Sequence, residues 1–138
     1  RVIAPWLYEE YLAHLIHQWK FRRERRMTTL LAALWRQRAE LHSRVDLLVP
    51  VPLYWRRQWQ RGFNQSELLC RQLLAQQRAG NLKGAFKVYG SCDTLRIAIV
   101  DDVLTTGATA AAVAEVLASA GASYIEVWCL ARTASPGA

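Results

Sequence analysis

One stretch of thirteen residues constrains the fold most, Ile97–Thr109, which reads I-A-I-V-D-D-V-L-T-T-G-A-T. Its first four residues, Ile97–Val100, form a continuous apolar run rich in β-branched side chains. Such a run is typical of a strand covered on both faces, as in a parallel sheet. Ligands of open α/β sheets bind beyond the carboxyl ends of the strands. The sequence therefore predicts a strand that ends in a site at Asp101 and Asp102.

A run of hydroxyl-bearing and small residues follows the acids and leads into an alanine-rich helix expected over Ala110–Ala120. The run comprises Thr105, Thr106, Gly107, Ala108 and Thr109. It offers three hydroxyls, a glycine that can adopt positive φ, and unobstructed amides at a helix N-terminus, which bind phosphate. Carboxylates beside a phosphate site suit a ligand that carries both hydroxyls and a phosphate, as a sugar phosphate does, because the carboxylates accept hydrogen bonds from the diol.

The same stretch resembles the phosphoribosyl pyrophosphate (PRPP) signature of the type I phosphoribosyltransferases: four apolar residues, two acids, two apolar residues, then T-T-G-A-T. One alternative is a buried strand followed by an ordinary capped helix. Another is the acidic pocket of a receiver domain, against which the T-T-G-A-T run argues. The resemblance implies that Asp101 and Asp102 are catalytic and hold the ribose hydroxyls, directly or through Mg²⁺, and that Thr105–Thr109 binds the 5′-phosphate.

Composition favours a single domain with an anionic partner. The 138 residues are 52% hydrophobic, enough for one core, and the net charge is +7. That charge favours phosphates, pyrophosphate or nucleic acid. Three widely spaced cysteines indicate neither a disulfide framework nor a zinc site, and no apolar run approaches the ~20 residues that span a bilayer. We expect a cytoplasmic protein without a membrane segment, and a fragment, since the chain opens at Arg1.

A second candidate anion site follows the apolar segment Asp46–Pro52, D-L-L-V-P-V-P, which we expect to be the first sheet strand, ending or near an edge at its prolines. The loop after it carries Arg56, Arg57, Arg61 and Gly62. Arginine forks suit phosphate oxygens and glycine permits close backbone approach, so this loop is a candidate for binding pyrophosphate. The alternative is a basic surface loop with two tryptophans packed beneath it. The acidic stretch Asp101–Thr109 favours the pyrophosphate loop, because a PRPP site needs a second group of residues that binds an anion.

The remaining segments are expected to alternate between helix and strand. From Trp6 to about Leu41 the apolar spacing predicts two helices, joined by the basic run Lys20–Arg26, which we interpret as a solvated junction in preference to a basic edge for an anionic partner. Asn64 is expected to cap a helix that extends to about Gln77, with Glu67 completing a capping box. Strands are expected over Ala85–Tyr89, pairing as a hairpin with Leu95–Val100, and over Tyr124–Leu130, with Gly121 as a helix C-cap.

Together with V-P-V-P-L, the segment R-G-F-N-Q-S-E-L-L resembles the competence protein F (ComF/GntX) branch of the phosphoribosyltransferases. L-I-H-Q-W-K-F, N-L-K-G-A-F and the terminal strand extend that resemblance over nearly the whole chain. Two departures stand out. The cysteine-rich, zinc-ribbon-like module that commonly opens the family is absent, and the stretch between the leucine-rich helix and N-L-K-G-A-F is short. We favour the explanation that mobile residues are missing from the sequence there.

The resemblance implies an α/β fold of type I phosphoribosyltransferase type, a mostly parallel sheet flanked by helices, with N-terminal helices at 6–41 and a core at 46–132 within one domain. It implies transfer of phosphoribosyl from PRPP to an unidentified, base-like small-molecule acceptor with pyrophosphate release, Mg²⁺ as cofactor, and a link to DNA uptake and nucleotide use. The alternative is a non-catalytic PRPP sensor or a DNA-uptake adaptor with a basic surface. Nucleic acid and a homodimer remain open as partners.

Overall fold

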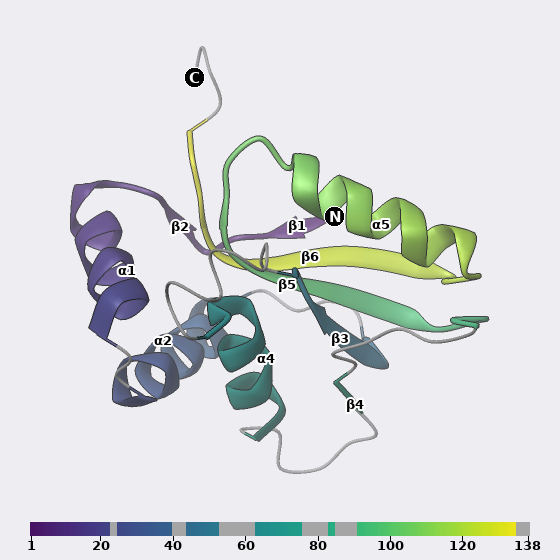
Figure 1. Cartoon of the computed structure of the whole chain (residues 1–138), viewed down its shortest axis with the longest axis horizontal. Helices are drawn as coiled ribbons and strands as arrows, with labels where there is room; N and C mark the ends of the chain where they lie inside the picture. Colours follow the sequence, from purple (N-terminus) through teal and green to yellow (C-terminus); the bar gives the residue numbers. More distant parts are fainter. Residues whose placement is uncertain (23–24, 40–43, 53–62, 76–82, 85–90, 135–138) are drawn as a thin grey trace.

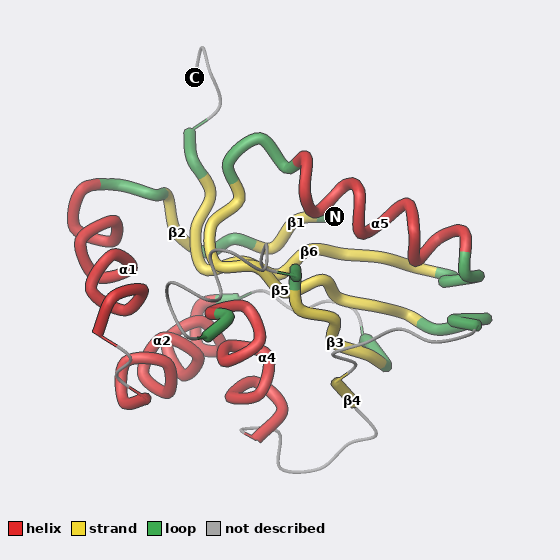
Figure 2. Tube along the Cα trace, in the orientation of Figure 1, coloured by secondary structure: helices red, strands yellow, loops and turns green. Residues whose placement is uncertain are grey.

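The computed structural model describes residues 1–22, 25–39, 44–52, 63–75, 83–84 and 91–134. All strand pairs in this part of the chain are parallel, and the sheet has the order β1-β6-β5-β3-β4, with β2 also paired to β6 (Figure 1). The strands are β1 (Val2–Ile3), β2 (Trp6–Leu7), β3 (Leu47–Pro50), β4 (Lys83–Gly84), β5 (Arg96–Leu104) and β6 (Tyr124–Arg132). The helices are α1 (Glu10–Arg22), α2 (Arg25–Arg38), α4 (Gln65–Ala75) and α5 (Ala108–Ser119) (Figure 2).

The predicted central strand is present and longer than expected. β5 continues through both aspartates to Leu104, because β6 pairs with it along that whole length, up to the pair Leu104 and Arg132. On its other edge β3 pairs with β5 from Ile97 to Val100. Both edges of Ile97–Val100 are thus occupied by parallel strands, and the predicted hairpin with Ala85–Tyr89 is wrong; residues 85–89 themselves lie outside the described part of the chain.

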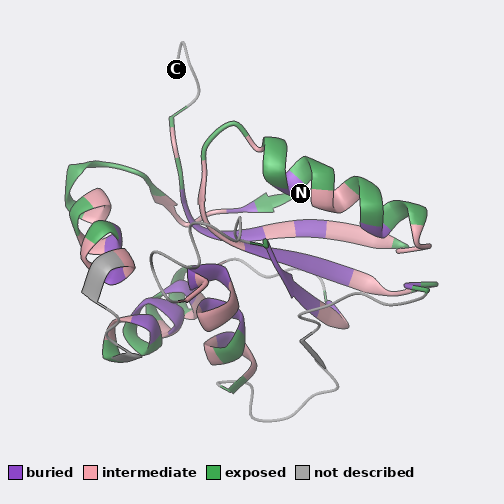
Figure 3. Ribbon diagram, viewed as in Figure 1, coloured by how far each residue is buried: buried purple, intermediate pink, exposed green. Residues whose placement is uncertain are grey.

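Helices cover both faces of the sheet, as predicted (Figure 3). Side chains of α1, α2 and α4 pack on one face, against a cluster that includes Leu48, Val100 and Leu130. On the other face Leu117 of α5 packs with Ile97 and Ile99. The alternation of Ile97 and Ile99 with Ala98 and Val100 between the two clusters follows from the period of two in a strand. The α/β architecture inferred from the sequence is therefore confirmed.

The N-terminus differs from the prediction. Two helices are present, but the residues expected to begin the first one, Trp6 and Leu7, form β2 and pair with Ala131 and Arg132 of β6. β1 pairs with the same strand further back, so Asp46–Pro52 holds the third strand of the chain and not the first. Two-residue strands are too short for a periodic signal, and the apolar pair at Trp6 fits a helical pattern equally well.

Other boundaries agree within a few residues. α5 begins two residues before the expected Ala110, and its end forms a Schellman motif around Gly121, whose φ is 101°. Gly121 follows the C-cap residue Ala120. Pro50 ends β3, and Pro52 follows it, where β4 no longer pairs with the chain. The amide of Val51, between the two prolines, donates to the carbonyl of Val100 at 2.8 Å. In the described segments, none of the helices has the length and apolar character that crossing a membrane requires.

Candidate functional site

The site lies where β5 runs past the end of β3. The last residue pair between these strands is Pro50 and Val100, so the next two residues of β5, Asp101 and Asp102, have β6 on one side and the end of β3 on the other. This is the carboxyl edge of a parallel sheet, at which ligands of open α/β proteins bind. Asp101 and Asp102 are within the strand and not beyond it, a small correction to the expectation.

The loop from β5 to α5 brings the predicted phosphate-binding residues to the same edge. Gly107 is the N-cap of α5 with φ 79°, a conformation that residues with a side chain adopt only at a cost. No side chain caps the helix at this residue, and within the loop the Ala108 amide donates to Thr106 Oγ1 at 3.3 Å. Thr105, Thr106 and Thr109 are exposed. Hydroxyls and the positive end of a helix thus face solvent beside two acids.

Asp101 is held by protein donors on one of its oxygens. Its Oδ1 accepts hydrogen bonds from the Asp102 amide at 2.8 Å and from Ser66 Oγ at 3.3 Å. Ser66 is buried in the first turn of α4. Burial and the neighbouring Asp102 carboxylate together raise the pKa of Asp101 to about 7. The Asp101 carboxyl is therefore poised to change its charge near neutral pH when a ligand binds.

Asp102 has a cationic partner from the N-terminal helix. Lys20 Nζ lies 3.0 Å from Asp102 Oδ2, and the Val103 amide donates to Asp102 Oδ1 at 2.7 Å. Burial opposes ionisation of Asp102, but the Lys20 ammonium and these hydrogen bonds outweigh it and lower the pKa of the Asp102 carboxyl. Adjacent aspartates are thus pushed in opposite directions, one toward the neutral acid and the other toward the carboxylate.

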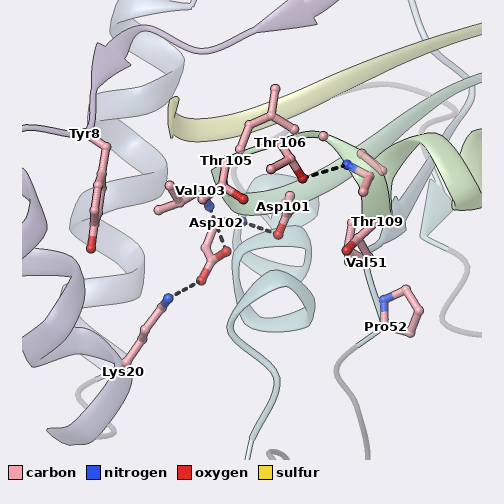
Figure 4. Close-up of a pocket in the computed structure, with 14 residues that line it drawn as sticks. Tyr8, Lys20, Val51, Pro52, Asp101, Asp102, Val103, Thr105, Thr106 and Thr109 are labelled. Carbon is pink, nitrogen blue, oxygen red and sulfur yellow. Dashed lines mark hydrogen bonds and ion pairs between the residues drawn. The ribbon is translucent and has the colours of Figure 1, made fainter. Parts of the chain in front are cut away.

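These groups surround one cavity of about 410 Å³ (Figure 4). Its lining joins the acids and the whole predicted phosphate loop to residues from three other parts of the chain: the connection between β2 and α1, α1 itself, and the two residues after β3. The lining residues are Tyr8, Lys20, Val51, Pro52 and every residue from Asp101 to Ala110. A cavity of this size suits a small, polar, phosphorylated molecule.

The arginine loop lies outside the described residues, and with it Arg56, Arg57, Arg61 and Gly62. The residues on either side of that segment are described and lie at the site: Val51 and Pro52 line the cavity, and Asn64 Nδ2 donates to the Val51 carbonyl at 3.1 Å. Asn64 also caps α4 as predicted, with its Oδ1 3.0 Å from the Ser66 amide. The carboxylate of Glu67 binds Arg71 at 2.9 Å, whereas a capping box would direct it back to the cap residue.

The acids fit a divalent cation that is shared with a ligand. Among the described residues there is no cluster of three or more His, Cys, Asp or Glu side chains that could hold a metal alone. Mg²⁺ keeps several waters and is commonly bound through one or two carboxylates together with substrate phosphates. Asp101 and Asp102 supply that number of carboxylates in the lining of a cavity, so the donor set suits a metal–ligand complex better than an all-protein site.

Sequence reasoning missed two polar side chains of this site. Ser66 belongs to the N-Q-S-E segment at the start of a predicted helix. That position does not indicate that its hydroxyl contacts Asp101. Lys20 belongs to the basic run interpreted as a solvated junction, yet it contacts Asp102. Lys20 follows Trp19 of the predicted apolar stripe, and neighbours on a helix are only 100° apart, but this pattern does not tell which side of the helix borders the site.

Comparisons with known proteins define the chain's relatives. A scan against protein-family models found no match. The chain is 37% identical over 164 residues to DNA utilization protein YhgH of Salmonella typhi, with 96% of this chain and 72% of that protein covered. It is 34% identical over 159 residues to Competence protein F of Haemophilus influenzae, with 91% and 69% covered. The alignment with the Salmonella typhi protein is longer than the 138 residues of this chain, so that protein has residues without a counterpart here.

Among solved structures, a purine phosphoribosyltransferase from Pyrococcus horikoshii superposes with a TM-score of 0.42 and 22% identity, over 76% of this chain and 69% of that one. The two sequence relatives are far more similar to this chain than the solved structure is, and their alignments cover most of each relative as well as most of this chain. By that similarity, the chain belongs to the family of competence protein F and the DNA utilization proteins.

Proposed function

We propose that this protein binds PRPP together with Mg²⁺ and transfers the phosphoribosyl group to a base-like acceptor, releasing pyrophosphate. One observation carries the proposal: the two aspartates and the T-T-G-A-T loop line one cavity at the carboxyl edge of a parallel sheet. Carboxylates for hydroxyls and a helix N-terminus for a phosphate, side by side, match the two ends of a ribose 5-phosphate. Membership of the competence protein F family supports the same reading.

In this proposal each group of the cavity has a separate task. Asp101 and Asp102 accept hydrogen bonds from the ribose hydroxyls, and the amides and hydroxyls of Thr105–Thr109 hold the 5′-phosphate. Arg56, Arg57 and Arg61 are assigned to binding the pyrophosphate. Mg²⁺, when bound, neutralises charge on that leaving group. The transition state resembles an oxocarbenium ion, so catalysis comes mainly from placement and from charges fixed in advance, and no residue is assigned as general base.

The names of the relatives, DNA utilization protein and Competence protein F, support a role in DNA uptake and in the use of incoming nucleotides. A phosphoribosyltransferase fits that role, because it joins bases to ribose phosphate. A PRPP sensor with the same cavity would bind the ligand and release nothing. Turnover therefore separates the two functions.

The test is to titrate Mg²⁺–PRPP into the whole protein by calorimetry and then to follow pyrophosphate release with a panel of nucleobases. We expect saturable binding that needs Mg²⁺, and pyrophosphate release with at least one acceptor. Binding without release for any acceptor would favour the sensor. A protein that binds no PRPP at millimolar concentration, with or without Mg²⁺, has neither function.

A further inference from the structure

The rotational setting of α1 is fixed by burial. Trp19 is almost fully buried, as is Ile16 one turn before it, and the Trp19 indole donates to the buried Thr28 Oγ1 of α2 at 2.7 Å. Successive residues on a helix are 100° apart, so this anchor turns Lys20 to the side of the helix that borders the cavity. In Figure 4 the Lys20 side chain reaches from α1 toward Asp102. Its position is thus part of the packing and not a chance surface contact.

Among the described residues, Asp102 is the one partner of the Lys20 ammonium, which leaves it hydrogen-bonding capacity. It carries three N–H donors and lies 3.0 Å from Asp102 Oδ2, its ion-pair partner within the described chain. The side chain is 23% exposed and lines the cavity shared with the threonine loop. Lys20 therefore presents a partly desolvated cation to whatever enters.

Ligand binding sets up a competition at Asp102. The Val103 amide already uses Oδ1, and Lys20 uses Oδ2. A divalent cation next to Oδ2 would lie close to the ammonium, and the two positive charges would repel each other in this partly buried site. A cation that binds Asp102 must therefore move Lys20 aside. Lysine can move, because its ammonium sits on a flexible four-carbon stem.

We infer that Lys20 is an exchangeable counter-ion: it neutralises Asp102 in the empty cavity and passes to an anionic group of the ligand when a metal–phosphate ligand takes its place. The inference rests on the proposed function for the ligand's identity, but its chemistry needs only a divalent cation and a phosphate or pyrophosphate that arrive together. Lys20 is then a specificity-determining residue. It disfavours the metal alone, which must displace the ammonium, and favours a metal–pyrophosphate unit, which displaces it and also binds it.

The test compares Lys20→Met with the wild type toward three probes: Mn²⁺ alone, Mg²⁺–pyrophosphate and Mg²⁺–PRPP. Methionine keeps the length and apolar contacts of the stem and removes the charge. We expect tighter Mn²⁺ binding by several-fold, because the competing cation is gone, and weaker binding of both pyrophosphate ligands by about tenfold, the loss typical of one charge-assisted hydrogen bond. The two changes run in opposite directions, which simple misfolding would not produce.

Two matched variants control for the loss of a positive charge elsewhere and for a change of side chain that keeps the charge. Arg26→Met removes one positive charge from the exposed end of the same basic run and should leave all three affinities unchanged. Lys20→Arg keeps a cation and should bind Mn²⁺ as weakly as the wild type does. If Lys20→Met does not fold, Lys20→Gln provides the same measurement with a neutral polar group.

The inference and the proposed function fail separately. Wild-type binding of PRPP with an unchanged affinity in Lys20→Met would overturn the role of Lys20 and leave the function intact. Unchanged Mn²⁺ affinity would overturn it as well. If the wild type binds Mg²⁺–pyrophosphate but not PRPP, the proposed function falls, while the opposite shifts in Lys20→Met would still support the exchange.

Discussion

The two ends of β5 use their polar groups differently. At the amino end they have partners within the protein: Asp46 Oδ2 accepts a hydrogen bond from the Arg96 amide at 2.9 Å. The Arg96 side chain donates from Nε to the Arg44 carbonyl at 2.8 Å, and its guanidinium lies 4.4 Å from the ring centre of Tyr124. At the carboxyl end, Asp101 has a raised pKa and the helix that follows has no side-chain cap. One end is built for stability, and the other keeps its hydrogen-bonding capacity for a ligand.

The largest difference should appear when one aspartate at each end becomes asparagine. Asp102→Asn removes the charge that we propose binds the ribose hydroxyls and the cation, so we expect PRPP affinity to fall by about a hundredfold or more, the equivalent of two charge-assisted hydrogen bonds. Asp46→Asn keeps a carbonyl acceptor for the Arg96 amide and should bind PRPP as the wild type does. Calorimetric titration of both variants tests this pair; equal losses in the two would remove the distinction between the ends.

Two glycines with positive φ allow the ends to be compared by stability. A Cβ at Gly121 (φ 101°) would lie 3.2 Å from the Asp93 backbone and would collide with its carboxylate, whereas a Cβ at Gly107 (φ 79°) would meet, among the described residues, only Leu104, at 3.9 Å. We expect Gly121→Ala to lower the free energy of unfolding by about 2–3 kcal/mol and Gly107→Ala by about 1–2 kcal/mol. Urea denaturation measures both losses.

The same glycines separate stability from binding. Although it is the milder change for folding, Gly107→Ala should weaken PRPP binding, because it alters the loop that we propose presents its amides to the phosphate. Gly121→Ala should leave the affinity of the folded fraction unchanged. Weaker binding in Gly121→Ala alone would contradict the assignment of the phosphate to the Gly107 loop.

The raised pKa of Asp101 makes stability depend on pH. Its pKa is about 7 in the folded protein against an ordinary 3.8, so the unfolded chain loses this proton first as the pH rises. The resulting destabilisation begins above about pH 4 and is complete above about pH 7. Asp101→Asn removes it, and we expect the variant to be more stable than the wild type by on the order of 2 kcal/mol at pH 8.

Thermal unfolding of Asp101→Asn across pH 4 to 8 checks the sign. The advantage of the variant should be smallest near pH 4, where the folded wild-type carboxyl is still protonated and the unfolded one, with an ordinary pKa of 3.8, is only about half ionised, and it should grow as the pH rises. An advantage that is equal at every pH would mean that the asparagine stabilises the fold by another route. No comparable gain is expected from Asp46→Asn.

The smallest effect is expected for Ser66→Ala. The Ser66 hydroxyl lies 3.3 Å from Asp101 Oδ1, a long hydrogen bond, and it favours the carboxylate. Its removal should cost about 0.5 kcal/mol of stability and raise the pKa of Asp101 slightly further. Carbon-detected NMR of the Asp101 carboxyl through a pH titration would measure that shift; a pKa that falls in Ser66→Ala would contradict this role.

How far sequence reasoning reached depended on whether a group was contiguous in the chain. Asp101, Asp102 and Thr105–Thr109 follow one another directly, so the period of the strand and the glycine before the helix were sufficient to place them together. Lys20 could not be placed, because its contact with Asp102 depends on how Trp19 and Thr28 seat α1. Charge patterns alone do not distinguish a solvated run from a single inward-facing member.

Strand pairing was the weaker part of the prediction for a related reason. A nearby apolar segment is an obvious partner for β5, yet both of its edges are taken by strands distant in sequence, β3 and β6. β1 and β2 are only two residues long, and they are strands because they pair with β6, not because of their own composition. Local patterns thus identified the central strand and its site, whereas its neighbours required tertiary structure.

Amide NMR on the whole protein during a titration with Mg²⁺–PRPP tests the central claim most directly, since a chain of 138 residues is well suited to it. We expect the amide resonances of Val103–Ala110 to shift progressively and to saturate, while those of Gly121–Ser123, after the other end of α5, keep their chemical shifts. Shifts at the Gly121 end without shifts in the threonine loop, or no shifts at either end, would contradict it.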